Sequence, residues 1–141
     1  MFSVLFPGQG SQSIGMIKDF YENFDYVKNL FDQADSALNL SITKIISDGP
    51  KEILDQTENT QPAIFLASYA IFQAIKKETS FDFNKASFFA GHSLGEYSAL
   101  SCAGYIKFPD TLKILKIRGD AMQNAVPRGI GGMIAVLGTT I

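Results

Sequence analysis

The sequence predicts an α/β protein in which a mainly parallel sheet is flanked by helices. Short, continuously apolar runs at residues 2–6, 86–90 and 133–137 are typical of strands that are buried on both faces. Segments with helical periodicity separate these runs, and helical connections place successive strands in parallel. The 141 residues suit one domain, and 46% hydrophobic against 18% charged residues is the composition of a folded globular chain.

The first half of the chain reads as one strand, one loop and a series of helices. Pro7-Gly8 ends the strand at residues 2–6, and residues 7–13 form a loop of small side chains. From Glu22 to Leu38, apolar residues recur at steps of three and four, which predicts an amphipathic helix. The phenylalanines of this region and the next helix are predicted to be core residues: Phe24, Phe31, Phe65 and Phe72.

The middle of the chain is predicted to contain two short helical pieces and one long helix. The short pieces lie within residues 41–56, separated by a turn at Asp48-Gly49-Pro50. The long helix is expected to start near Thr60, with Pro62 in its first turn, and to end at Lys76-Lys77.

The last part of the chain repeats the strand–helix alternation. A helix from Ser93 to about Cys102 directly follows the strand at residues 86–90. Pro109 opens the next helix and Pro127 ends it, before the predicted third strand, Met133–Leu137. Three strands are few for a parallel sheet, and the chain stops soon after the third, so we expect a fragment of a larger domain.

Composition excludes several classes of function. A net charge of −2 gives no general attraction for nucleic acid or anionic lipid, so neither is an expected partner. One cysteine, Cys102, and one histidine, His92, leave no internal disulfide and no metal site to expect. No apolar run approaches the roughly 20 residues that cross a bilayer, and no secretory signal is recognisable, which predicts a cytoplasmic protein.

Gly91-His92-Ser93-Leu94-Gly95 is a G-x-S-x-G nucleophile elbow between a predicted strand and a predicted helix. This turn holds the serine hydroxyl out at the helix N-terminus, where free N–H groups and the helix dipole favour developing negative charge. The loop after the first strand, Phe6-Pro-Gly-Gln-Gly-Ser-Gln12, lacks the spacing of a dinucleotide or phosphate loop. In a parallel sheet it lies at the same edge as the elbow, so one of its N–H groups could pair with that of Leu94 to hold an oxyanion.

Both stretches closely resemble those of the malonyl-CoA:acyl carrier protein transacylases and the acyltransferase domains of related synthases. The resemblance extends to Asn59-Thr-Gln-Pro-Ala63, to Arg118-Gly119 and to Gly132-Met-Ile-Ala-Val136, in the same order. It covers the whole chain but only about the first half of the family's length. It implies an α/β-hydrolase-like acyltransferase core, with residues 1–127 in the catalytic subdomain and 128–141 opening a small ferredoxin-like subdomain.

The resemblance implies a ping-pong transfer in fatty acid biosynthesis, with no cofactor. Ser93 would take the malonyl group from malonyl-CoA and pass it to the phosphopantetheine thiol of acyl carrier protein. The backbone N–H groups of Gln9 and Leu94 would hold the oxyanion, and Arg118 would bind the malonyl carboxylate. His92 occupies a position where members that select malonyl often carry histidine; an ordinary packed ring is the alternative.

One feature departs from the family pattern. The base that activates the serine is, in the family, a histidine roughly a hundred residues beyond it. His92 is the only histidine here, and its position next to Ser93 should direct it away from the hydroxyl. We therefore expect this chain to be inactive alone and to survive by self-association or by pairing with a complementing segment. A serine hydrolase and a non-catalytic acyl-CoA-binding remnant remain alternatives.

Overall fold

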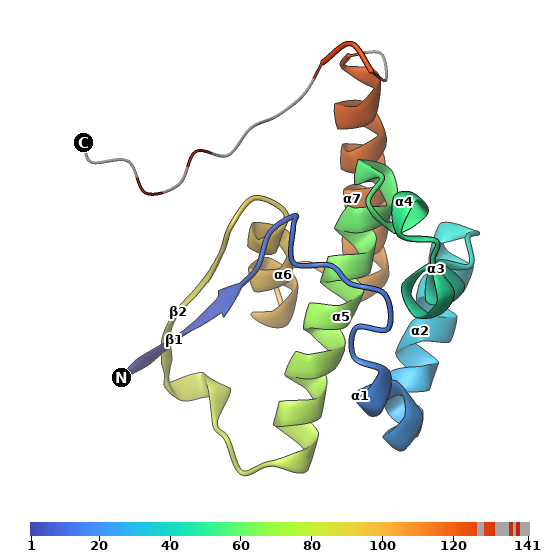
Figure 1. The fold of residues 1–141 in the computed structure, drawn as a ribbon. Coiled ribbons are helices and arrows are strands. Elements are labelled where there is room, and N and C mark those ends of the chain that lie inside the picture. Colours follow the sequence, from blue (N-terminus) through green and yellow to red (C-terminus); the bar gives the residue numbers. More distant parts are fainter. Residues whose placement is uncertain (127–128, 132–135, 137, 139–141) are drawn as a thin grey trace.

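The computed structural model describes residues 1–126, 129–131, 136 and 138, which form two strands and a set of helices (Figure 1). The elements follow in the order β1 (Phe2–Phe6), α1 (Lys18–Asn23), α2 (Asp25–Leu38), α3 (Ile42–Asp48), α4 (Lys51–Leu54), α5 (Thr57–Glu78), a 3-10 turn (Phe83–Lys85), β2 (Ala86–Gly91), α6 (Gly95–Cys102) and α7 (Phe108–Asn124). The predicted α/β class is confirmed.

The strands β1 and β2 pair in parallel, as predicted, because helices α1 to α5 connect them. Ser3 lies opposite Phe88 and Phe6 opposite Gly91, so both strands end at the same edge of the sheet. The predicted third strand at 133–137 falls on residues that the structure does not describe, Val136 apart.

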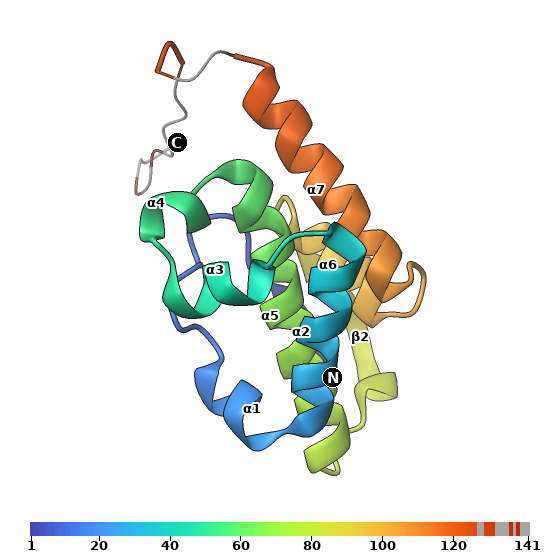
Figure 2. The ribbon, with the colours of Figure 1, turned by 90° about the vertical axis from the view of Figure 1, so that its right-hand side faces the viewer.

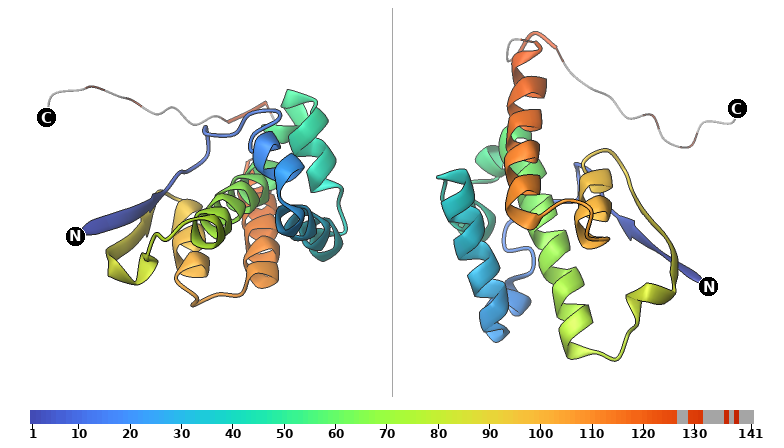
Figure 3. Two further views of the ribbon diagram at one scale, coloured as in Figure 1. Left: turned by 90° about the horizontal axis from the view of Figure 1, so that it is seen from below. Right: turned by 180° about the vertical axis from the view of Figure 1, so that it is seen from behind.

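Helix α5 occupies the centre of the molecule (Figures 1 and 3). The two strands and α6 lie on one side of it, and α1, α2 and α3 lie on the other. Helix α7 packs along α5 and also contacts α2 (Figure 2). None of the described helices combines the length and the apolar character needed to cross a membrane.

Several helix boundaries differ from those predicted; among them, α6 begins at Gly95 rather than at Ser93, and α7 ends at Asn124 rather than at Pro127. The helix expected from Glu22 is split at Phe24, whose extended backbone (φ −126°, ψ 110°) ends α1 and starts α2. The break lets the ring of Phe24 stack on that of Tyr26, with centroids 5.4 Å apart.

Helix α5 begins at Thr57 rather than at Thr60, so Pro62 lies beyond its first turn. Side-chain bonds tie this earlier start to α4: Asn59 Nδ2 donates to the carbonyl of Ile53 at 2.9 Å, and Thr60 Oγ1 donates to that of Leu54 at 2.5 Å. The carbonyls at the end of α4 are thereby satisfied by α5. The predicted pair of short helices around the turn at Gly49 is confirmed by α3 and α4.

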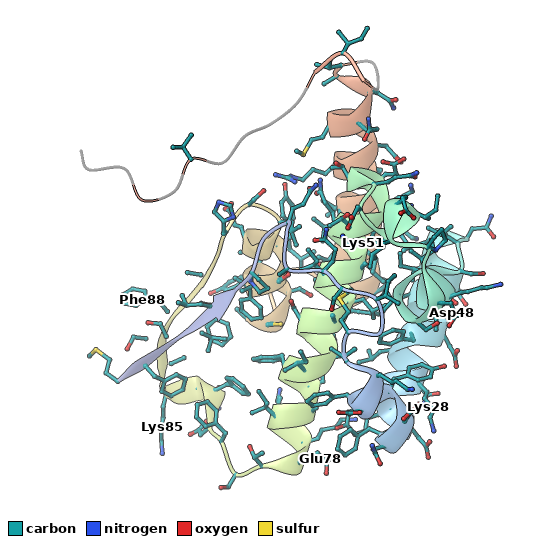
Figure 4. The ribbon with its side chains drawn as sticks, viewed as in Figure 1. Lys28, Asp48, Lys51, Glu78, Lys85 and Phe88 are labelled. Carbon is teal, nitrogen blue, oxygen red and sulfur yellow. The ribbon has the colours of Figure 1, made fainter. Side chains whose placement is uncertain are left out.

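The core phenylalanines are placed as predicted, but the strands are not buried on both faces. Phe31, Phe65 and Phe72 are buried, and Phe24 packs against the same helical core. On the sheet, Phe6 is buried beneath α5 and α6, whereas Leu5 is 75% and Phe88 68% exposed. Phe88 points away from the helices (Figure 4). In the described part of the chain, α5 and α6 cover only one face of the sheet.

Candidate active site

Ser93 lies in the sharp turn between the end of β2 at Gly91 and the start of α6 at Gly95. Its backbone has φ +56°, a left-handed conformation that is strained for a side chain other than glycine. Helical bonding begins at once, since Gly95 N donates to the carbonyl of His92 at 2.9 Å and Glu96 N to that of Ser93 at 3.1 Å. The turn leaves Ser93 exposed directly at the N-terminus of α6.

Both glycines of the elbow are required by close backbone approach. A Cβ atom on Gly91 would lie 2.0 Å from the carbonyl of Gly95. A Cβ atom on Gly95 would lie 2.5 Å from the carbonyl oxygen of Phe6, at the end of β1. Only glycine therefore allows β1, β2 and α6 to meet around Ser93.

The loop after β1 lies beside the elbow, as the parallel sheet predicts. His92 N donates to the carbonyl of Phe6 at 3.2 Å, and the His92 ring lies against Gly8, where an added Cβ would be 2.5 Å from Nδ1. Within the described residues, the backbone N–H groups of Gln9 and Leu94 donate to no other group. Neither of the N–H groups predicted to hold an oxyanion is thus engaged within the described fold, and their role stays a prediction.

Side chains that the sequence analysis did not single out anchor this loop. Gln12 accepts from Gly10 N at 2.8 Å and donates through Nε2 to Asp55 Oδ1 at 2.8 Å. The bond from Gln12 and the one from Lys51 hold the pKa of the Asp55 carboxyl below its usual range. Gln9 Nε2 also reaches Thr57 Oγ1, at 3.4 Å. The loop is therefore tied to the corner between α4 and α5.

Arg118 reaches Ser93 from α7. Its Nη2 donates to Ser93 Oγ at 3.2 Å, across 25 residues of sequence. Its Nη1 donates to Gln61 Oε1 at 2.6 Å, and its guanidinium carbon lies 5.8 Å from the centre of the Tyr97 ring. The structure thus brings together Ser93 and Arg118, two residues that the sequence analysis predicted to share a site.

Gln61 is a site residue that the sequence analysis quoted only as part of a family motif. It lies on α5 and is fully buried, with Oε1 on Arg118 and Nε2 donating to Met122 Sδ at 3.3 Å. The available signal was a run of three polar residues, Asn59 to Gln61, that leads directly into the apolar part of a long helix. A buried amide in that position must find hydrogen-bond partners.

The described site holds no general base in contact with the serine. Within the described residues, Ser93 Oγ accepts a hydrogen bond from Arg118, and no bond joins the His92 ring to that hydroxyl. No group of three or more His, Cys, Asp or Glu side chains in this part of the chain could hold a metal ion. The arrangement places an exposed serine hydroxyl at a helix N-terminus beside a guanidinium, a combination that would suit an acyl group that carries a negative charge.

Comparisons with known proteins point to one family. Residues 4–140 match the acyl transferase domain family. The chain is 45% identical over 137 residues to the malonyl CoA-acyl carrier protein transacylase of Haemophilus influenzae, covering 97% of this chain and 43% of that protein. It is 46% identical over 134 residues to the Bacillus subtilis (strain 168) protein of the same name, covering 95% and 41%.

Solved structures agree with these relatives. An acyl carrier protein S-malonyltransferase from Vibrio cholerae superposes with a TM-score of 0.84 at 44% identity, covering 91% of this chain and 41% of that one. A malonyl-transacylase in complex with its type II PKS acyl-carrier protein gives a TM-score of 0.84 at 42% identity, covering 91% and 40%. The chain thus spans less than half the length of the relatives it matches.

Proposed function

The chain belongs to the acyl transferase domain family, and from that membership we propose that its site transfers a malonyl group from malonyl-CoA to the phosphopantetheine thiol of acyl carrier protein. The observation that carries the proposal is the 3.2 Å contact between Arg118 Nη2 and Ser93 Oγ. It sets a fixed positive charge beside the atom that would bear the acyl group. The named relatives and the solved carrier-protein complex support the same substrates.

In the first half-reaction, Ser93 Oγ attacks the thioester carbonyl of malonyl-CoA. The carbonyl oxygen becomes an oxyanion, which the N–H groups of Gln9 and Leu94 would stabilise together with the N-terminus of α6. The carbon–sulfur bond then breaks, coenzyme A leaves as the thiol, and a malonyl ester remains on Ser93. The hydroxyl proton must pass to a base, a role that the family resemblance assigns to a histidine outside residues 1–141.

In the second half-reaction, the carrier's phosphopantetheine thiol attacks the ester carbonyl in the same oxyanion site. A new thioester forms, and the bond to Ser93 Oγ breaks with return of a proton to the serine. Arg118 would hold the substrate in both halves. The free carboxylate of a malonyl ester is separated from Oγ only by a carbonyl and a methylene carbon, and a guanidinium can grip it with two parallel bonds.

Residues 1–127 would belong to the catalytic subdomain and 128–141 would open a small ferredoxin-like subdomain. The chemistry uses substrate thioesters and no cofactor. We place it in the cytoplasm, a compartment that keeps thiols such as that of phosphopantetheine reduced. His92, packed against Gly8, would shape the malonyl side of the site.

The test is covalent loading of Ser93 in the whole protein that carries this sequence. After incubation with malonyl-CoA, intact-mass analysis should show one added malonyl group, and peptide mapping should place it on Ser93. Ser93→Ala should remove the adduct, whereas Ser87→Ala, which changes an exposed serine on β2, should not. Loading of Ser93→Ala at the wild-type rate would refute the assignment.

A serine hydrolase is the second candidate, because the elbow alone serves both reactions. Water would then replace the carrier thiol as acceptor, and free malonate would form without carrier protein. Arg118 favours the transferase, since a carboxylate-binding cation has little use in a site for neutral esters. Malonate release at the same rate with and without carrier protein would favour the hydrolase.

A further inference from the structure

We propose that Gln61 is the positioning residue that gives this site its preference for a carboxylate-bearing acyl group. It would do so by orienting the Arg118 guanidinium through a neutral acceptor, leaving the positive charge available to the substrate. This inference rests on the proposed function, because it assigns a role within the same site. Three features of the structure support it: the contacts of Gln61, the uncharged nature of the acceptor that it offers to Arg118 and the close packing of α5 against α7.

Gln61 is fully buried, and both ends of its amide are occupied. Oε1 accepts from Arg118 Nη1 at 2.6 Å, and Nε2 donates to Met122 Sδ at 3.3 Å. The thioether sulfur of Met122 can only accept a hydrogen bond, so the amide nitrogen of Gln61 faces Met122 and the amide oxygen faces Arg118. A bond from a cation to a buried acceptor is among the stronger hydrogen bonds in proteins. The guanidinium is therefore held at Nη1 while Nη2 faces Ser93 Oγ.

The acceptor is uncharged, and this matters for binding an anion. Within the described part of the chain, the ion pairs join lysines to carboxylates and none includes Arg118. Besides Gln61 and Ser93, the Arg118 guanidinium lies near the Tyr97 ring, which attracts the cation without cancelling its charge. A glutamate in place of Gln61 would fill the same space but would neutralise the guanidinium before substrate arrives.

The backbones around Gln61 are packed too closely to permit much adjustment. Gly119 follows Arg118 on α7, and a Cβ there would lie 2.6 Å from Glu58 Cα and 2.8 Å from the carbonyl oxygen of Thr57. Gln61 lies on the next turn of the same helix as these atoms. The distance between the two helices is thus fixed next to Arg118, so a change in the side chain at position 61 acts on the guanidinium rather than on helix separation.

The experiment compares malonyl and acetyl transfer in the whole protein carrying Gln61→Glu or Gln61→Leu. Gln61→Glu should lower the malonyl-to-acetyl preference about 10- to 100-fold, with acetyl transfer unchanged or faster. Gln61→Leu keeps the charge but removes the acceptor, so it should reduce malonyl transfer alone. The control is Gln73→Glu, which adds the same charge to α5 three turns away and should leave the preference unchanged.

A second readout is independent of turnover. The guanidinium NMR signals of Arg118 should show restricted rotation in the wild type, and Gln61→Leu should release it. Melting temperatures identify any variant that does not fold. If Gln61→Glu fails to fold, the malonyl-to-acetyl preference measured for Gln61→Leu tests the role of Gln61 instead. Equal losses of malonyl and acetyl transfer, or an unchanged ratio, would overturn the role of Gln61. If the wild type shows no preference for malonyl, the proposed function fails and the inference fails with it.

Discussion

Arg118 is held by Gln61 and packed near Tyr97, and its contact with Ser93 is the one that substrate would use. In the whole protein, Arg118→Ala should weaken malonyl transfer by about 1.5–3 kcal/mol, the scale of a charge-assisted hydrogen bond. Acetyl transfer should change far less, because acetyl has no carboxylate to bind. Rates with both acyl-CoA substrates measure the difference.

Arg118→Lys is the control for charge alone. An ammonium keeps the positive charge but cannot hold a neutral acceptor and a carboxylate in one plane, so this variant should also be impaired for malonyl. Equal losses for malonyl and acetyl in both variants would indicate that Arg118 has a structural role at the contact between α5 and α7.

Cys102, the last residue of α6, should be chemically inert in the folded protein. Burial raises the pKa of its thiol to about 12, because the thiolate would lose its hydration. Only about one thiol in 10,000 is then ionised at pH 8, and the thiolate is the reactive form. Alkylation by iodoacetamide should therefore be slow in buffer and fast in urea. Rapid labelling of the folded protein would contradict this placement in the core.

At the scale of elements, the loop after β1 depends on the pair formed by Gln12 and Asp55. The bond from Gln12 is the main cause of the lowered pKa of Asp55, and Lys51 contributes further. Gln12→Ala should raise that pKa toward its ordinary value and speed hydrogen exchange at Gly10 N, which loses its acceptor. A carbon-detected NMR titration and amide exchange measure the two effects.

The pH dependence of this loop follows from the direction of the shift. A carboxyl whose pKa is lowered by folding stabilises the folded form at neutral pH, and the contribution is lost as the pH falls through the folded pKa. The protection of the Gly10 N–H, measured relative to its intrinsic exchange rate at each pH, should then fall in acid in the wild type and be insensitive to that titration in Gln12→Ala. An unchanged Asp55 pKa in the variant would show that Lys51 alone sets it.

Sequence patterns predict an element well where its cause is local. The elbow, the two described strands, the proline-led start of α7 and the pair of short helices follow from glycine spacing, apolar runs and turn residues. The break at Phe24 and the start of α5 at Thr57 coincide with stacking of Phe24 on Tyr26 and with side-chain bonds to α4, specific contacts that a pattern of apolar spacing does not reveal. Gln61 was missed for a different reason, because its partners on α7 are 57 and 61 residues away and are brought to it only by the fold.

At the scale of the whole molecule, the sheet exposes an apolar face in the described residues. Leu5 is 75% and Phe88 68% exposed, on neighbouring strands and on the side away from α5 and α6. The prediction that these strands are buried on both faces is wrong for this part of the chain. An apolar strand sequence indicates that a face of the sheet is to be covered, but not which element covers it. A polypeptide of residues 1–141 should therefore self-associate through this face.

Sedimentation of that polypeptide tests the expectation. Replacing Leu5 and Phe88 together by threonine keeps β-propensity and removes apolar area, so it should increase the monomer fraction. The matched control replaces Ile117, a 68% exposed residue on α7, by threonine and should leave association unchanged. Association that is insensitive to the sheet variant would assign the contact to another surface.

The same polypeptide should not catalyse repeated transfer. Ser93 needs a base to take its proton, the sequence has one histidine, and the His92 ring lies against Gly8 without a bond to the hydroxyl in the described residues. Loss of the base from a serine–histidine pair commonly lowers the rate at least about a thousandfold, leaving the contributions of oxyanion contacts and substrate binding. Malonyl transfer to carrier protein by residues 1–141, with intact mass excluding longer contaminants, should remain far below that of the whole protein. Comparable turnover, abolished by His92→Ala, would instead make His92 the base.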